Sequence, residues 1–90
     1  MAKILRVVGQ TEPTAVRRKD GTEIQKSTIR LKELGGDYAN EYSAAVFGNL
    51  SSVRFDQGEV VAAELSFSIH ESNGGFFQDV TARDVVRIKN

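Results

Sequence analysis

The fold is decided by residues 59–86, whose sequence is EVVAAELSFSIHESNGGFFQDVTARDVV. From Val61 to Ile69 the odd positions are apolar and most even positions are polar. This two-residue alternation is typical of a strand with one buried face. The strand ends at residues 72–75 (SNGG), where Asn-Gly tolerates the positive φ angles of a type I′ turn. The stretch therefore predicts a β-hairpin closed by a two-residue turn.

A turn at this position fixes which residues lie opposite one another. It pairs Phe67 with Val80, and because both are apolar this face is expected to point into the core. The other face pairs Glu64 with Arg83, an opposite-charge pair that favours the same register. The remaining predicted pairs are Leu65 with Ala82 and Val61 with Val86 inside, and Ser68 with Asp79 and Ser66 with Thr81 outside.

A second hairpin is indicated by the turn sequence KDGT at residues 19–22. The register of this hairpin places Ile29 opposite Glu12, an apolar residue against a carboxylate. We therefore expect a β-bulge near residues 9–13, where a bent first strand would need one. The arms cover residues 2–18 and 22–34, and Ser27, Ile29 and Leu31 are expected to face inward.

Two further elements complete the chain. A third strand is expected from about Tyr38 to Phe47, followed by a helix of one or two turns at residues 48–55, with Asn49 as its N-cap. Residues 1–90 therefore form a single all-β domain of three strands, a short helix and two strands. Five bent strands in this order form an OB-fold barrel, whose second and third strands typically carry the ligand. A five-stranded open sandwich is the structural alternative.

The charges limit the possible functions. Twelve Lys and Arg residues balance 12 Asp and Glu residues, whereas a dedicated nucleic-acid-binding protein usually carries a basic surplus. The distribution is uneven, because residues 1–34 hold eight basic and four acidic side chains and residues 35–90 hold four and eight. Any anion-binding surface is therefore expected in the first third of the chain.

Several function classes are disfavoured by what the sequence lacks. There is no cysteine, and the single histidine belongs to no metal-binding spacing, which disfavours the usual metal and nucleophile sites. No apolar run approaches the roughly 18 residues that span a bilayer, and the first ten residues do not resemble a signal peptide. We expect a cytoplasmic protein that is not an enzyme, has no membrane contact, and needs no cofactor or metal.

Parts of the chain resemble bacterial single-stranded-DNA-binding proteins. Residues 46–48 (VFG) and 56–60 (DQGEV) are similar to the segment after that family's third strand, and residues 71–82 (ESNGGFFQDVTA) are similar to its last hairpin. The likeness covers about residues 4–88 and is closer still to short bacterial OB-fold proteins of unassigned function. It implies binding of single-stranded DNA or RNA and a homodimer or homotetramer. The family's DNA-stacking tryptophans have no counterpart, since the chain contains no Trp.

Basic side chains recur on the outer face of the second predicted strand. OB domains hold single strands in a basic groove with aromatic platforms, so this face is a candidate rail for phosphates. The alternative is a solvated face whose lysines prevent edge pairing. The candidate residues are Lys26, Arg30 and Lys32 on the strand, with Thr28 between them, and Arg17 and Arg18 on the adjoining hairpin.

Two phenylalanines are candidates for base stacking. The predicted register turns Phe77 outward beside His70, where it would stack on a base or lie in a subunit interface. The resemblance assigns Phe47 as the family's aromatic at that place, whereas the apolar pattern alone assigns it to the core. Phe67 is expected in the core, and Phe55 is expected to close the end of the barrel.

Two functions remain open. The first is a non-catalytic OB-fold protein that binds single-stranded nucleic acid through its basic second strand. The second is an OB-fold module for protein interaction or oligomerisation without nucleic-acid binding. The basic first third and the family resemblance favour the first, and the zero net charge and absent tryptophans favour the second.

Overall fold

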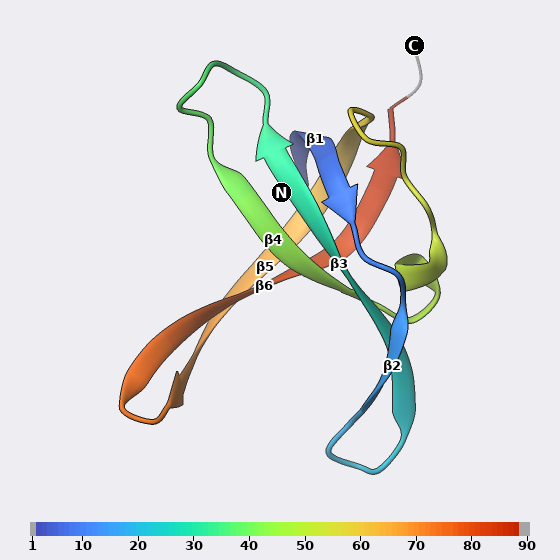
Figure 1. Ribbon diagram of the computed structural model, residues 1–90, viewed down its shortest axis with the longest axis vertical. Coiled ribbons are helices and arrows are strands. Elements are labelled where there is room, and N and C mark those ends of the chain that lie inside the picture. The colour runs from blue at the N-terminus through green and yellow to red at the C-terminus, as the bar shows by residue number, and fades with distance from the viewer. Residues whose placement is uncertain (1, 89–90) are drawn as a thin grey trace.

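The computed structural model describes residues 2–88 and shows a closed β-barrel (Figure 1). Residues 1, 89 and 90 of the predicted domain lie outside the described part. The ring closes because β1 pairs with β5 on one side and with β3 on the other, in the order β1-β5-β6-β4-β3. The elements are β1 (Ala2–Gln10), β2 (Thr14–Arg17), β3 (Glu23–Glu33), β4 (Glu41–Phe47), the 3₁₀ helix η1 (Gly48–Ser52), β5 (Val60–Ser72) and β6 (Gly75–Arg87).

This five-stranded ring is the predicted OB-fold barrel. β1 and β2 are successive segments of the first arm, and both pair with β3. All neighbours in the ring are antiparallel except β4 and β6, which meet in parallel at Ala45 and Thr81. The short helix lies between the third and fourth strands of the ring, as expected.

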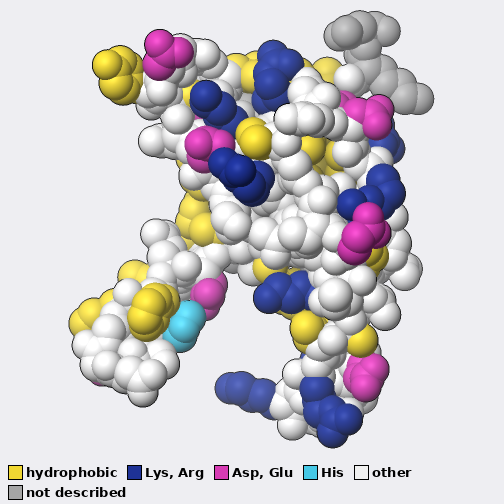
Figure 2. Space-filling model, viewed as in Figure 1, with side chains coloured by type: hydrophobic (Ala, Val, Ile, Leu, Met, Phe, Trp, Pro, Cys, Tyr) yellow, Lys and Arg dark blue, Asp and Glu magenta, His cyan; other side chains and the backbone are white. Residues whose placement is uncertain are grey.

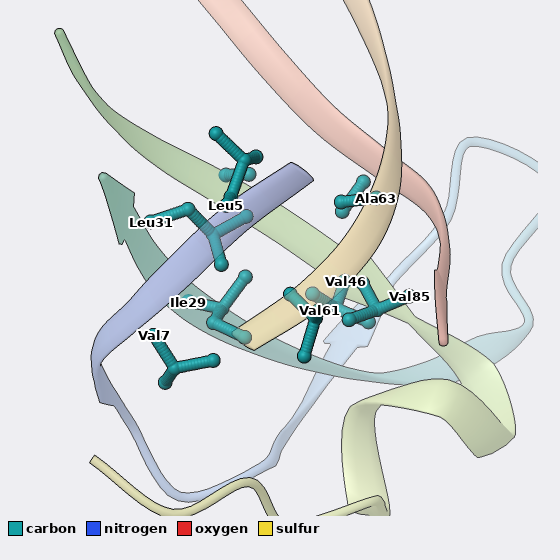
Figure 3. Close-up of a cluster of buried hydrophobic side chains, with 10 residues drawn as sticks. Leu5, Val7, Ile29, Leu31, Val46, Val61, Ala63 and Val85 are labelled. Atoms are coloured by element: carbon teal, nitrogen blue, oxygen red, sulfur yellow. The ribbon is translucent and has the colours of Figure 1, made fainter. Parts of the chain in front are cut away.

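The core forms where the inward faces of the five strands meet (Figure 3). In β3 the predicted alternation holds, since Ser27, Ile29 and Leu31 are all buried. Fully burying a Leu or Ile side chain contributes about 1.5–3 kcal/mol, so these few residues supply much of the stability. The buried hydrophobic residues are Leu5, Val7, Ile29, Leu31, Ala44, Val46, Val61, Ala63, Ala82 and Val85.

The last hairpin has the predicted turn and the predicted register near it. Asn73 and Gly74 have φ angles of 52° and 79°, as a type I′ turn requires. Phe67 lies opposite Val80, and Leu65 lies opposite Ala82. The pairs Ser68 with Asp79 and Ser66 with Thr81 are also confirmed.

Closer to the barrel the predicted register is wrong by one residue. Glu64 lies opposite Asp84 and not opposite Arg83, because the register shifts between Glu64 and Leu65. Ala82 and Val85 are both buried although they are three positions apart, which a regular strand cannot achieve. A β-bulge on β6 resolves this by adding one residue between them.

Three side chains assigned to the core by alternation are exposed, and Ile69 is the most exposed of them at 70%. Val86 is 52% exposed, because the bulge turns Val85 inward instead and leaves Val61 opposite Arg87. Phe67 is 46% exposed, because the hairpin continues beyond the barrel. Near the turn, the alternation therefore predicts correctly which residues share a face of the hairpin. It does not predict where along the hairpin the core ends.

The first arm contains the expected irregularity. The register shifts just before Gly9, and residues 11–13 between β1 and β2 are not in a strand. As a result Gln10, and not Glu12, lies opposite Ile29. This removes the conflict between a carboxylate and the core.

The middle of the chain differs from the prediction in detail. The third strand of the ring starts at Glu41, and the helix is a five-residue 3₁₀ turn. Its N-cap is Phe47, with no side-chain cap hydrogen bond, so Asn49 lies inside the helix and does not cap it. The turn is held instead by the Ser51 hydroxyl, which donates to the Gly48 carbonyl at 2.6 Å. Phe55 packs against the core after the helix, as predicted.

Two hairpin arms project from the barrel in the same view (Figure 1). We call residues 14–26, where β2 pairs with the start of β3, the basic arm. We call residues 65–80, where β5 and β6 extend past the core, the aromatic arm. No helix in the described chain is long and apolar enough to cross a membrane.

Candidate nucleic-acid interface

The outer face of β3 carries the basic residues that alternation placed there. Arg30 is exposed, and Lys26 and Lys32 are half-buried, since their stems lie on the sheet. They alternate with the buried residues Ser27, Ile29 and Leu31, so the strand that builds the core also fixes the spacing of the cations. At about 3.3–3.4 Å per residue, consecutive outward positions are roughly 7 Å apart.

An aromatic ring lies beside this face. Phe47 of β4 is directly opposite Lys26, and the Lys26 Nζ is 5.9 Å from the ring centroid. Phe47 is 39% exposed, whereas Val46 beside it is buried. The apolar pattern that assigned Phe47 to the core is therefore wrong, and the ring lies on the outer face. A cation and a half-exposed ring side by side can meet a phosphate and a base together.

The charge of Arg30 is partly balanced. Its Nη2 lies 3.1 Å from Glu41 Oε1, with both side chains about half exposed. Exposed ion pairs of this kind contribute about 0–1 kcal/mol, so the guanidinium can exchange this carboxylate for another anion at little cost. Lys26 and Lys32 form none of the ion pairs found within residues 2–88.

Arg6 extends the basic face onto β1. It lies opposite Lys32, and its Nη1 donates a hydrogen bond of 2.8 Å to the Gly58 carbonyl. Arg6 and Lys32 line a cavity of about 240 Å³ together with Glu33, Leu34 and Gly35. Sequence reasoning missed Arg6, because its place beside Lys32 depends on the β1–β3 register.

Glu33 supplies a fixed negative charge at this cavity. Its carboxylate accepts a hydrogen bond of 2.8 Å from the Tyr42 hydroxyl and lies 3.6 Å from the Lys3 ammonium. The Tyr42 hydrogen bond and the Lys3 charge lower the pKa of Glu33, and the same hydrogen bond raises the pKa of Tyr42. The Glu33 carboxylate therefore interacts with Tyr42 and Lys3. The cations that line the cavity are Arg6 and Lys32.

The basic arm ends in a tight turn that presents arginines. Arg17 and Arg18 are exposed, and the Arg18 amide donates to the Thr22 carbonyl at 2.7 Å. Asp20 accepts hydrogen bonds from the hydroxyl and amide of Thr22, at 2.6 and 3.0 Å, and these lower the pKa of Asp20. The turn is thus ordered by its own acidic residue, and both arginines lie directly before it, where β2 ends.

Phe77 lies on the aromatic arm as predicted, facing outward beside His70. The two rings are stacked, with centroids 5.5 Å apart and planes 26° apart, and Phe77 is 53% exposed. His70 Nδ1 lies 2.6 Å from Asp79 Oδ2, which fixes the imidazole ring over the phenyl ring. The stack is a flat platform of the kind on which bases pack.

Phe47 and Phe77 belong to different parts of the surface. β4 and β6 run parallel with Ala45 beside Thr81, so Phe47 and Phe77 are six positions apart along the two strands. At about 3.3 Å per residue this separation is roughly 20 Å. The structure thus brings Lys26, Arg30, Lys32 and Phe47 together and leaves Phe77, Arg17 and Arg18 on the two arms.

The space-filling view shows how these parts are arranged (Figure 2). Lys and Arg side chains gather on the barrel and on one arm, hydrophobic side chains and the histidine lie on the other arm, and an open notch separates the arms. Within residues 2–88 no group of three or more His, Cys, Asp or Glu side chains is placed to hold a metal ion.

Comparison with known protein families and curated proteins identified no relative of this chain. No protein-family model matches the chain, and a search of curated proteins gave no significant match.

Proposed function

We propose that this chain is a non-catalytic OB-fold protein that binds single-stranded nucleic acid on the outer face of β3 and β4. The observation that carries the proposal is the Lys26–Phe47 pair, in which a lysine Nζ lies 5.9 Å from the centroid of a half-exposed ring. Arg30 and Lys32 continue the cationic row along the same face. Phosphates would lie along this row, and a base would stack on Phe47.

The physical chemistry of such a face predicts sequence-independent binding. Phosphate contacts carry no base information, and a stacked base contributes about 1–3 kcal/mol whatever its identity. Because the whole chain has zero net charge, long-range attraction to a polyanion is weak, and affinity depends on these local contacts. Binding is therefore expected to be strongest at low salt.

The test is fluorescence anisotropy with labelled single-stranded oligonucleotides over a series of salt concentrations. Replacing Lys26 and Lys32 by Ser removes two cations whose side chains point away from the core. Each phosphate contact contributes about 0.7 to the slope of log K against log salt, so the slope should flatten by about 1.4. Affinity should fall alike for every sequence. Replacing Phe47 by Ala should weaken binding by about 1–3 kcal/mol without changing the slope.

The matched control removes two cations that lie on neither β3 nor β4. The double variant Arg54→Ser and Arg83→Ser should retain nearly all of the affinity and the slope, with thermal unfolding to check the fold of both double variants. If the wild type does not bind at low salt, the nucleic-acid proposal fails. If both double variants lose affinity equally, binding occurs at another surface.

Protein association is the second candidate function. The observation that favours it is the aromatic arm, where Phe67, Ile69, Phe76 and Phe77 are 46%, 70%, 76% and 53% exposed. Large apolar side chains grouped on a projecting hairpin are typical of an interaction surface. This candidate function needs no nucleic acid. An oligomer that fails to bind oligonucleotides would support protein association and would contradict nucleic-acid binding.

A further inference from the structure

The basic row of β3, which consists of Lys26, Arg30 and Lys32, ends at a cavity. Lys32 lines this cavity, β3 ends one residue later, and the chain continues through Leu34 and Gly35 into the loop that leads to β4 (Figure 1). A single strand laid along the row would therefore reach the cavity at one of its ends. The cavity volume of about 240 Å³ is smaller than the roughly 300–1,000 Å³ of pockets for drug-sized ligands, so the cavity suits a small chemical group.

Two cations lie side by side at this cavity. Arg6 on β1 is directly opposite Lys32 on β3, and directly opposed residues of an antiparallel pair have Cα atoms about 4.5–5.5 Å apart and side chains on the same face. The Arg6 guanidinium donates one hydrogen bond, of 2.8 Å, to the Gly58 carbonyl and has further N–H groups to donate. Neither cation forms any of the ion pairs found within residues 2–88. The two side chains can therefore hold one anion between them.

The charge at the cavity matches a doubly charged anion. Glu33 lies 3.6 Å from Lys3, and Glu41 on the neighbouring strand β4 lies 3.1 Å from Arg30, so these two pairs cancel. The two cations of the cavity remain without a carboxylate partner in the described chain. An internal phosphate of a nucleic acid carries one negative charge, whereas a phosphate monoester carries about −1.5 to −2 at pH 7. The charges therefore fit a terminal phosphate better than an internal one.

We infer that this cavity binds the terminal phosphate of a nucleic-acid single strand, so that the protein distinguishes a phosphorylated end from a hydroxyl end. The inference rests on the proposed function, because the rest of the strand lies along the basic row. The phosphate monoester accepts hydrogen bonds from both Arg6 and Lys32, as charged donors favour. Since the row has this cavity at one end, the protein recognises only one end of the strand, either the 5′ or the 3′ end.

The test compares oligonucleotides of one sequence that are labelled on an internal base and differ only at their ends. The ends are hydroxyls on both sides, a 5′-phosphate, or a 3′-phosphate. In fluorescence anisotropy at low salt, one of the phosphorylated strands should bind about tenfold tighter than the hydroxyl-ended strand, which is roughly the effect of one charge-assisted hydrogen bond. The other phosphorylated strand should bind like the hydroxyl-ended one. A gain of equal size at both ends, as added charge alone would give, overturns the inference.

Two lysines of the row give a matched pair of variants. Lys32→Ser should abolish the preference for the phosphorylated end. Lys26→Ser should weaken binding of every oligonucleotide by the same factor and keep the preference, because Lys26 is six residues from Lys32, about 20 Å at about 3.3 Å per residue. Arg6→Gln, which keeps a donor for the Gly58 carbonyl, should abolish the preference as well. A preference that survives both Lys32→Ser and Arg6→Gln overturns the assignment of the cavity.

The outcomes separate this inference from the proposed function. Equal binding of all the oligonucleotides at low salt overturns recognition of the end and leaves nucleic-acid binding in place, whereas a wild type that binds none of them overturns both. Free phosphate is another source of the same anion. Inorganic phosphate at the concentration of the protein, with the ionic strength held constant, should leave the preference intact, because it lacks the contacts along the row. Loss of the preference under these conditions would assign the cavity to free phosphate and overturn the inference.

Discussion

Tyr42 connects the candidate interface to the aromatic arm through a single side chain. Its hydroxyl donates to Glu33 at 2.8 Å, and its ring meets Phe67 edge-on at 6.0 Å. Glu33 lines the cavity that also contains Arg6 and Lys32. The hydroxyl therefore holds a carboxylate beside two cations, and it sets how much net positive charge this end of the basic row presents.

The pH dependence of stability should show this hydrogen bond. The pKa of Glu33 is lowered mainly by Tyr42, so its contribution is present above the ordinary carboxyl pKa and is lost as pH falls through the lowered value. The pKa of Tyr42 is raised by Glu33, so its contribution is present below the ordinary phenol pKa and is lost as pH rises through the raised value.

We therefore expect Tyr42→Phe to be less stable than the wild type at neutral pH, and the difference to shrink at both extremes. Denaturant unfolding from acid to alkaline pH measures it. Glu33→Gln, which removes the carboxylate and keeps a hydrogen-bond acceptor, should lose the acid limb of the profile. A Tyr42→Phe difference that does not vary with pH would show that the loss is one of packing alone.

At the scale of elements, the last hairpin shows what a sequence can and cannot specify. Asn-Gly and the alternation around it were sufficient for the turn and for every pair from Leu65 to the turn. The bulge was not predictable, because Val85 and Val86 are the same residue type and the pattern does not say which one is buried. Only contact with the other strands makes that choice, since Val85 enters the core and Val86 stays outside.

The candidate nucleic-acid interface was also predictable only in part. Alternation within β3 placed Lys26, Arg30 and Lys32 outward without knowledge of any neighbour. The positions of Arg6, Glu41 and Phe47 depend on how β1 and β4 pair with β3, and the register of those strands is not encoded in a local turn. Side chains contributed by one strand could therefore be predicted, whereas contacts between strands could not.

The turn of the aromatic arm gives a prediction about this element alone. Gly74 has a φ of 79°, which costs a β-branched residue about 1–2 kcal/mol. Gly74→Val should therefore speed amide exchange in the arm by about tenfold, while the amides of Ile29 and Leu31 in the barrel exchange as before. Gly74→Asn is the matched control, because Asn tolerates this conformation, and it should change little. Equal acceleration in arm and barrel would show that the hairpin and the core unfold together.

At the scale of the whole molecule, the fold separates two kinds of surface. The basic row lies on β3 and continues toward β1, whereas the exposed side chains of Phe67, Ile69, Phe76 and Phe77 lie on an arm made of β5 and β6 (Figure 2). Although the net charge is zero, the cations of the basic row and the exposed apolar side chains of the aromatic arm occupy different strands. One surface is cationic and the other is apolar, so occupation of one does not require occupation of the other.

Ile29 and Ile69 have similar sequence patterns around them, but they should contribute differently to the stability of the fold. Ile29 is fully buried in the barrel, and Ile69 is 70% exposed on the arm, although each occupies an apolar position of an alternating strand. Ile29→Ala creates a cavity in a closed core and should cost about 2–5 kcal/mol. Ile69→Ala removes few contacts and should cost about 0.5 kcal/mol or less. Urea unfolding of both variants measures the difference. Comparable losses would mean that the arm packs as part of the core, in conflict with the exposure of its apolar side chains.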